Sequence, residues 1–159
     1  MNTLSQTGAE QRLKELGFIL PAPPTPLGAY TESVKTGRLL FFSGMLPVVN
    51  RKPKYIGRIG REFDTEAGRD AAFTAGMNAL SAAREHLGTL DKVTRVVRLG
   101  VFLATHGDYT EHAKVADGAS DLFESVFGKE KTSTRLVLGV ASLPLGVPVE
   151  LEVILEVLE

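Results

Sequence analysis

The segment DTEAGRDAAFTAGMNALSAAREHLG, residues 64 to 88, decides the fold class of this chain of 159 residues. Asp64 or Thr65 can cap the start of a helix there, and Gly88 can end it. One face of that helix carries residues at helical spacing, most of them small: Ala72, Ala75, Gly76, Ala79, Leu80, Ala83 and Leu87. Because small side chains let a helix lie close to a sheet, the segment predicts a long helix packed against strands.

Strands are predicted on both sides of this helix. The other elements are a hairpin over residues 29–44, which turns at Thr36-Gly37 and has a buried strand from Leu39 to Phe42, a strand from Val93 to Ala104, a helix within residues 106–128, and strands from Arg135 to Ala141 and from Val149 to Val157. The order β-β-α-β-α-β-β predicts an α+β fold in which two helices cover one face of a mixed sheet.

The N-terminal segment predicts an extension to this core. Thr7 and Glu10 have the spacing of a capping box, which predicts a short helix that stops at Gly17. PAPPTPLG, residues 21–28, predicts an extended, polyproline-like arm. Too little sequence precedes that arm to form a second core, so we expect one domain over residues 1–159, with residues 1–26 as a helical and Pro-rich extension.

The composition excludes several classes of protein. The net charge of −1, the aromatic content of 7% and the absence of Trp argue against a nucleic-acid surface. The chain has no cysteine, which excludes disulfides and thiolate chemistry and fits a reducing compartment. No continuous apolar segment in the first twenty residues resembles a secretory signal, and no run approaches the roughly 18 apolar residues of a membrane span. We therefore expect a cytoplasmic protein without a membrane partner.

Two segments near the C-terminus carry candidate functional residues. In STRLVLGVASLP, residues 133–144, Arg135 stands at the head of an otherwise apolar strand. It is either a solvated strand end, a structural ion pair, or a group that binds a small anion. The last strand alternates acidic and apolar residues, with Glu150, Glu152 and Glu156 on one face. Three acids exceed what solubility needs, so one of them is a candidate for a functional role.

Four segments at consistent spacing resemble one family. They are GAY at 28–30, FFSGMLP at 41–47, STR at 133–135 and ASLPLGVPVELEVI at 141–154. They resemble the Rid family of reactive intermediate deaminases, also called the YjgF or endoribonuclease L-PSP-like family, over roughly residues 27–159. The leader ELGFILPAPP and the stretch GVASLPLGVPVE are similar to its chorismate-mutase-like branch.

The resemblance implies a fold, an assembly and a reaction. The fold would be chorismate-mutase-like (bacillus type), assembled as a homotrimer whose sheets form a central barrel and whose ligand clefts lie between subunits. The reaction would be hydrolysis of enamines and 2-imino acids to 2-keto acids and ammonia, without a cofactor or a metal. The partner molecule would be a small carboxylate, a 2-imino or 2-keto acid.

The resemblance also implies roles for single residues. Arg135 would hold the substrate carboxylate, Glu150 would place the attacking water, and Tyr30 would complete the catalytic group. Ser43, Gly44, Asp117 and Val137 would bind substrate beside Arg135.

Three positions depart from the family pattern. Asp117 stands where an asparagine is common, and Leu136 and Met45 stand where polar residues are usual. The departures at Leu136 and Asp117 favour, as an alternative, a non-catalytic trimer that binds small carboxylates as a sensor or scaffold. RNA binding or endoribonuclease activity is a further alternative, which the charge and the few aromatic residues disfavour.

Other chemistry finds little support in the sequence. Ser43 has no G-x-S-x-G surroundings, so a strand-end turn is a better interpretation than a nucleophile. His106, Asp108, Glu111 and His112 cluster, but the spacing of the two histidines does not match a zinc site on one helical face. The basic stretch NRKPKYIGRIGR, residues 50–61, predicts a solvated loop with a short edge strand, with a binding loop as the alternative.

Overall fold

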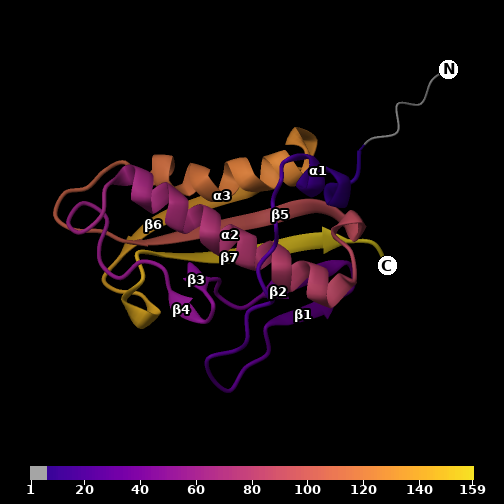
Figure 1. Cartoon of the computed structure of the whole chain (residues 1–159), viewed down its shortest axis with the longest axis horizontal. Helices are drawn as coiled ribbons and strands as arrows, with labels where there is room; N and C mark the ends of the chain where they lie inside the picture. Colours follow the sequence, from indigo (N-terminus) through magenta and orange to yellow (C-terminus); the bar gives the residue numbers. More distant parts are fainter. Residues whose placement is uncertain (1–6) are drawn as a thin grey trace.

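The chain folds into a mixed sheet covered by helices on one face, as shown by a computed structural model that describes residues 7–159 (Figure 1). The elements are α1 (Ala9–Glu15), β1 (Ser33–Thr36), β2 (Leu39–Phe42), β3 (Val48–Val49), β4 (Lys52–Pro53), α2 (Thr65–Leu87), β5 (Val93–Ala104), α3 (His112–Phe127), β6 (Thr134–Val140) and β7 (Val149–Val157). The α+β class and the element order are as expected, with β3 and β4 forming an additional small hairpin.

The main sheet has the strand order β1-β2-β7-β5-β6. β5 runs parallel to β6 and antiparallel to β7, and β1, β2 and β7 pair antiparallel in turn. β6 is the last strand in this order and is therefore an edge strand of the chain, and α3, which connects β5 to β6, packs beside both. Arg135 therefore lies on an edge of the sheet, close to α3.

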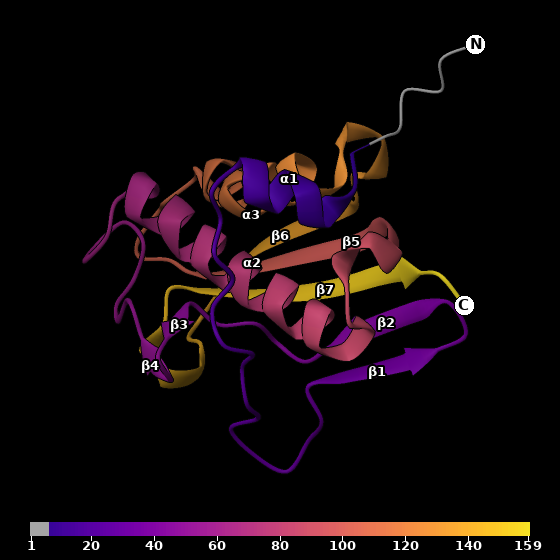
Figure 2. The ribbon, with the colours of Figure 1, turned by 45° about the vertical axis from the view of Figure 1, so that its right-hand side comes forward.

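The two faces of the sheet differ sharply in polarity. On the face under α2 and α3, alternate residues of β7 are buried with at most 1% exposed, among them Leu151, Val153 and Leu155. The acidic residues of the same strand point to the opposite face, which no helix covers within residues 7–159 (Figure 2). The prediction that the acidic and apolar residues of the last strand lie on opposite faces is confirmed. The side of the sheet without helices is called the open face below.

The long helix α2 begins and ends as the sequence predicts. The carboxylate of Asp64 accepts a hydrogen bond from the backbone N–H of Ala67, and Gly88 adopts a left-handed φ of 80°. α3 crosses α2 so closely at Gly118 that a Cβ there would lie 2.2 Å from the carbonyl oxygen of Arg69. The small residues of these helices thus allow a dense core of the kind that native packing requires.

Two expectations about local structure are wrong. α1 begins after Gly8, which has no side chain to cap the helix, and the backbone N–H of Glu10 donates to Asp91 Oδ1 at 3.1 Å. The carboxylate of Glu10 binds Arg84 and the backbone N–H of Leu90. β2 is buried on one side only: Leu40 is 0% exposed, whereas Phe41 is 38% exposed, because Phe41 lies on the open face. The predicted helix and strand boundaries are otherwise confirmed within a few residues.

The N-terminal arm crosses the outside of α2 on its way to β1, where both views show the indigo trace in front of that helix (Figure 2). The hydroxyl of Ser81 in α2 donates a hydrogen bond to the carbonyl oxygen of Pro21, at 2.6 Å. The arm is therefore fixed to the helix layer and does not hang free.

Candidate functional site

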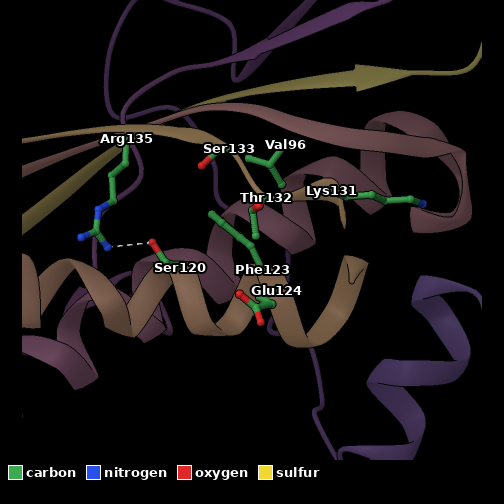
Figure 3. Close-up of a pocket in the computed structure, with 8 residues that line it drawn as sticks. All are labelled: Val96, Ser120, Phe123, Glu124, Lys131, Thr132, Ser133 and Arg135. Carbon is green, nitrogen blue, oxygen red and sulfur yellow. Dashed lines mark hydrogen bonds between the residues drawn. The ribbon is translucent and has the colours of Figure 1, made fainter. Parts of the chain in front are cut away.

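Arg135 lies in a concavity and not in bulk solvent. Its Nη1 donates a hydrogen bond to Asp117 Oδ1 at 2.7 Å and a second to Ser120 Oγ at 3.0 Å, both on α3. Figure 3 shows the bond from Arg135 to Ser120. The side chain is 27% exposed and borders a cavity of about 180 Å³ between β6 and α3. The interpretation of Arg135 as a freely solvated strand end is therefore wrong.

The contacts to α3 occupy only one part of the guanidinium. Both use Nη1, so the edge formed by Nε and Nη2 has no hydrogen-bond partner within residues 7–159. A guanidinium edge of this kind matches a carboxylate with two parallel hydrogen bonds. Asp117 and Ser120 thus fix the cation while leaving a bidentate edge available.

Asp117 also belongs to a chain of charges that extends away from Arg135. Its Oδ2 lies 4.0 Å from Arg69 Nη1, and Arg69 Nη2 in turn lies 3.0 Å from Asp121 Oδ2. Asp117 therefore acts on Arg135 as a positioning group. The part of the sequence prediction in which Asp117 itself binds substrate is not tested.

Residues next to Arg135 in β6 point alternately to the two faces. Val137 packs against the hydrophobic core on the helix side, in register with Val101 of β5. Leu136 is 43% exposed and lies on the open face. In a single chain Leu136 is therefore turned away from the guanidinium.

Glu150 lies on the open face of β7, beside the end of β2. It is half-buried, and burial raises the pKa of its carboxyl. A Cβ on Gly44 would lie 1.9 Å from Glu150 Oε1, so the carboxyl rests directly against the glycine backbone. The SG motif therefore needs glycine at position 44 for close approach.

Tyr30 and Ser43 lie near Gly44 but are already engaged. The hydroxyl oxygen of Tyr30 accepts a hydrogen bond from the backbone N–H of Leu27 at 2.9 Å. Ser43 Oγ donates to the carbonyl oxygen of Thr31 at 2.7 Å. The latter contact ties the SG segment to the residues before β1.

Arg135 and Glu150 do not face each other within one chain. Arg135 is in register with Leu99 of β5, and Glu150 is in register with Phe102 of the same strand. Because side chains alternate along a strand, positions 99 and 102 point to opposite faces. The predicted site residues thus form two separate groups, one around Arg135 and one around Glu150, Gly44, Tyr30 and Ser43.

Two side chains near these groups were not identified from the sequence. Ser120 holds Arg135, and its position three residues after Asp117 on one helical face was the available signal. Glu32 borders the same cavity as Tyr30 and Gly44, and burial raises the pKa of its carboxyl. Its position two residues after Tyr30 gave no distinctive signal.

Neither a metal-binding cluster nor a membrane-spanning helix is found among the described residues. No group of three His, Cys, Asp or Glu side chains within residues 7–159 could hold a metal ion. The ring of His112 instead lies 5.5 Å from that of Tyr109. No helix in the described part of the chain has the length and apolar character needed to cross a membrane.

The chain is similar to one protein family and to several known proteins. The family model described as "YjgF/chorismate mutase-like, putative endoribonuclease" matches residues 10–155. Protein TCP17 of Trypanosoma cruzi is 36% identical over 157 residues, which cover 98% of both chains. A 2-iminobutanoate/2-iminopropanoate deaminase of Dermatophagoides farinae is 29% identical over 132 residues, 83% of this chain and 88% of its own.

Solved structures agree with these sequence relatives. The crystal structure of the protein Atu1372 from Agrobacterium tumefaciens, a protein of unknown function, superimposes with a TM-score of 0.86 at 36% identity. The match covers 94% of this chain and 92% of the Agrobacterium chain. The similarity therefore includes the N-terminal arm region as well as the sheet and its helices.

Proposed function

Because the chain belongs to the YjgF/chorismate mutase-like family, we propose that it is a Rid-type deaminase that hydrolyses reactive 2-imino acids to 2-keto acids and ammonia. The observation that carries the proposal is the guanidinium of Arg135, which borders a concavity, is fixed by Asp117 and Ser120, and keeps its Nε and Nη2 edge without a hydrogen-bond partner within residues 7–159. The relative named as a 2-iminobutanoate/2-iminopropanoate deaminase supports the same reaction class.

The active assembly in this proposal is a homotrimer. The open face carries exposed apolar side chains that no helix covers within residues 7–159: Val34, Phe41, Leu136 and Leu138. Association through this face would bury them. Since Arg135 and Glu150 lie on opposite faces of one chain, a complete site would then combine the Arg135 group of one subunit with the Glu150 group of its neighbour.

The chemistry in this site needs few groups. The substrate carboxylate binds the free edge of Arg135, which fixes the imine carbon close to Glu150. The ionised Glu150 carboxylate accepts a proton from water as the water oxygen forms a bond to the imine carbon, and it passes that proton to the nitrogen, which gives a carbinolamine. Transfer of the carbinolamine hydroxyl proton to the nitrogen, again through Glu150, then breaks the C–N bond, which releases ammonia and leaves the 2-keto acid.

The proposal is tested by generating 2-imino acids in situ with an amino-acid oxidase and following ammonia release with and without the protein. We expect acceleration by the wild type and a loss of about 10- to 100-fold in Arg135→Gln, since a hydrogen-bonded charge pair contributes about 1.5–3 kcal/mol. Arg61→Gln, which removes an exposed guanidinium paired with Glu62, is the control and should keep the wild-type rate. Unchanged ammonia release in the presence of wild-type protein would refute the deaminase.

A non-catalytic carboxylate binder is the second candidate. Its support is Asp117, whose carboxylate offsets part of the charge of Arg135. Calorimetry that detects binding of a 2-keto acid, lost in Arg135→Gln and without any turnover, would favour it. The net charge of −1 continues to disfavour the ribonuclease alternative.

A further inference from the structure

A cavity of about 430 Å³ lies between the N-terminal arm and the segment after β2, well above the 180 Å³ of the concavity at Arg135. Its lining includes most of the arm from Pro21 to Leu27, and on the other side Met45, Leu46, Val48 and Asn78. Most of these side chains are apolar. A small-molecule site typically has this size and character.

Both walls of the cavity are fixed in place. The arm is held to α2 at one end by the hydrogen bond from Ser81 to the carbonyl of Pro21, and at its other end the Leu27 N–H donates to the Tyr30 hydroxyl, which closes a local turn within the arm. Its prolines restrict the backbone further, because each fixes its own φ. The arm is therefore a preformed wall that needs little ordering when a ligand binds.

The opposite wall is fixed by a buried amide. Asn78 of α2 is 3% exposed, and its Nδ2 donates to the carbonyl oxygens of Leu46 and Val48 at 2.8 and 2.9 Å. These two bonds use both N–H donors of the amide and fix it against the segment after β2. The neighbouring side chains at this wall, Met45, Leu46 and Val48, are apolar.

The cavity adjoins the group around Glu150. Tyr30 and Gly44 both line it, and Gly44 also lies directly against the Glu150 carboxyl. The charged side chains in the lining are Glu32 and Arg51, of opposite sign, so the lining has no net charge. A neutral apolar group attached to a substrate near Gly44 would therefore suit this space.

We propose that this cavity receives the side chain of the substrate and that the arm, through Leu27 in particular, determines specificity for 2-imino acids with large apolar side chains. This inference rests on the proposed function, because it takes the reacting carbon to lie beside Glu150. The preference would follow from burial of the ligand's apolar surface against the arm.

The test compares imines generated in situ from alanine, leucine and phenylalanine, with the full-length protein. We expect kcat/KM for the leucine and phenylalanine imines to exceed that for the alanine imine. Leu27→Ala should lower this ratio by roughly 10-fold, the scale that loss of apolar contacts gives in such a pocket. Leu158→Ala, which shortens an exposed leucine outside the cavity lining, should leave the ratio unchanged.

Calorimetry with the product-like acids pyruvate and 4-methyl-2-oxopentanoate separates this inference from the deaminase proposal. A preference for the larger acid that Leu27→Ala removes, without turnover, would support the cavity assignment and reject the reaction. Turnover with equal kcat/KM for all three imines, or a ratio unchanged in Leu27→Ala, would overturn the cavity assignment and leave the reaction standing. Neither turnover nor a difference in affinity would overturn both.

Discussion

The guanidinium of Arg135 is bound to the protein through one of its three nitrogens. Nη1 is bound to Asp117 and Ser120, and the Nε and Nη2 edge has no hydrogen-bond partner in the described chain. A carboxylate so close to the cation both fixes its position and lowers the positive potential that an anionic ligand meets. These two effects act in opposite directions on ligand affinity, so Asp117 can be probed by changing its charge alone.

We predict that Asp117→Asn binds small 2-keto acids more tightly than the wild type. The amide oxygen can still accept the hydrogen bond from Arg135, while the competing negative charge is gone. An exposed pair contributes about 0.2–1 kcal/mol, which corresponds to roughly 1.5- to 5-fold in Kd. Calorimetry at two salt concentrations measures this, with Asp121→Asn, a partner of Arg69, as the control. Weaker binding in Asp117→Asn would show that the charge is needed for positioning.

Glu150 predicts a pH dependence of stability. Burial raises the pKa of its carboxyl above the ordinary value of 4.5, so the folded state binds more protons than the unfolded state between these two values. The stability that protonated Glu150 contributes to the folded state is therefore fully present below pH 4.5 and is lost as the pH rises through the pKa of the folded state.

We predict that Glu150→Gln gains stability relative to the wild type as the pH is raised from about 4 to 7, because the amide carries no charge to bury. Urea unfolding of both proteins across this range measures the difference in free energy of unfolding. Glu85→Gln, which removes the same charge from an exposed position on α2, should follow the wild type. A difference independent of pH would rule out the proposed cause.

At the scale of secondary-structure elements, the contact between α2 and α3 depends on one glycine. A Cβ at Gly118 would lie 2.2 Å from the carbonyl oxygen of Arg69, a backbone atom that cannot turn aside. A Cβ at Gly76, on the other helix of the same pair, would lie 2.8 Å from the terminal methyl Cδ2 of Leu122. The first contact requires the helices to separate, whereas a rotation of one side chain relieves the second.

We predict that Gly118→Ala lowers the free energy of unfolding by about 1–3 kcal/mol, since overpacking outweighs the gain of roughly 1 kcal/mol in helix propensity. Gly76→Ala makes the same substitution inside a helix and should stay within about 1 kcal/mol of the wild type. Denaturant unfolding of the two variants provides the comparison. Equal stability of the two would mean that the close approach at Gly118 is not a constraint.

The elements that the sequence predicts best are those with an unbroken pattern. The predicted limits of β5 and β7 match the structure to the residue, because long apolar alternation and a buried face specify them locally. The capping box at Thr7 is wrong because α1 has Gly8 as its N-cap and because Glu10 binds Arg84 and the Leu90 N–H, far along the chain. Local spacing cannot reveal such a competitor.

The site was predictable only in part, for a similar reason. Arg135 and Glu150 stand out in the sequence because a lone cation and an acidic row interrupt apolar patterns. Their position on opposite faces follows from register with Leu99 and Phe102, which depends on how β5 pairs with both neighbours. The hydrogen bond from Arg135 to Ser120 likewise depends on the packing of α3 beside β6.

At the scale of the whole molecule, the open face exposes large apolar side chains to solvent. Leu138 is 44% exposed and Phe41 is 38% exposed on the side of the sheet that lacks helices. Apolar side chains gathered on one face of a sheet favour association over solvation. This surface supports association of the chain, and the proposed trimer is testable independently of any enzymatic activity.

We predict that the wild type has a mass in solution of about three times the 17.1 kDa of one chain, and that Leu138→Glu shifts it toward the monomer. Light scattering coupled to size exclusion measures both masses. Ile19→Glu changes an isoleucine that is 89% exposed on the N-terminal segment and should leave the mass unaltered. A monomeric wild type at micromolar concentration would contradict the assembly and, with it, a site shared between subunits.

The arm that crosses α2 has a further consequence. Its residues contribute to a ligand-sized cavity, yet the sheet and the α2–α3 layer form without them. Exchanging the short stretch from Pro21 to Leu27 for a different one should therefore alter which molecules the protein accepts at little expense to its hydrophobic interior. To that extent, ligand selectivity and folding depend on separate parts of the polypeptide.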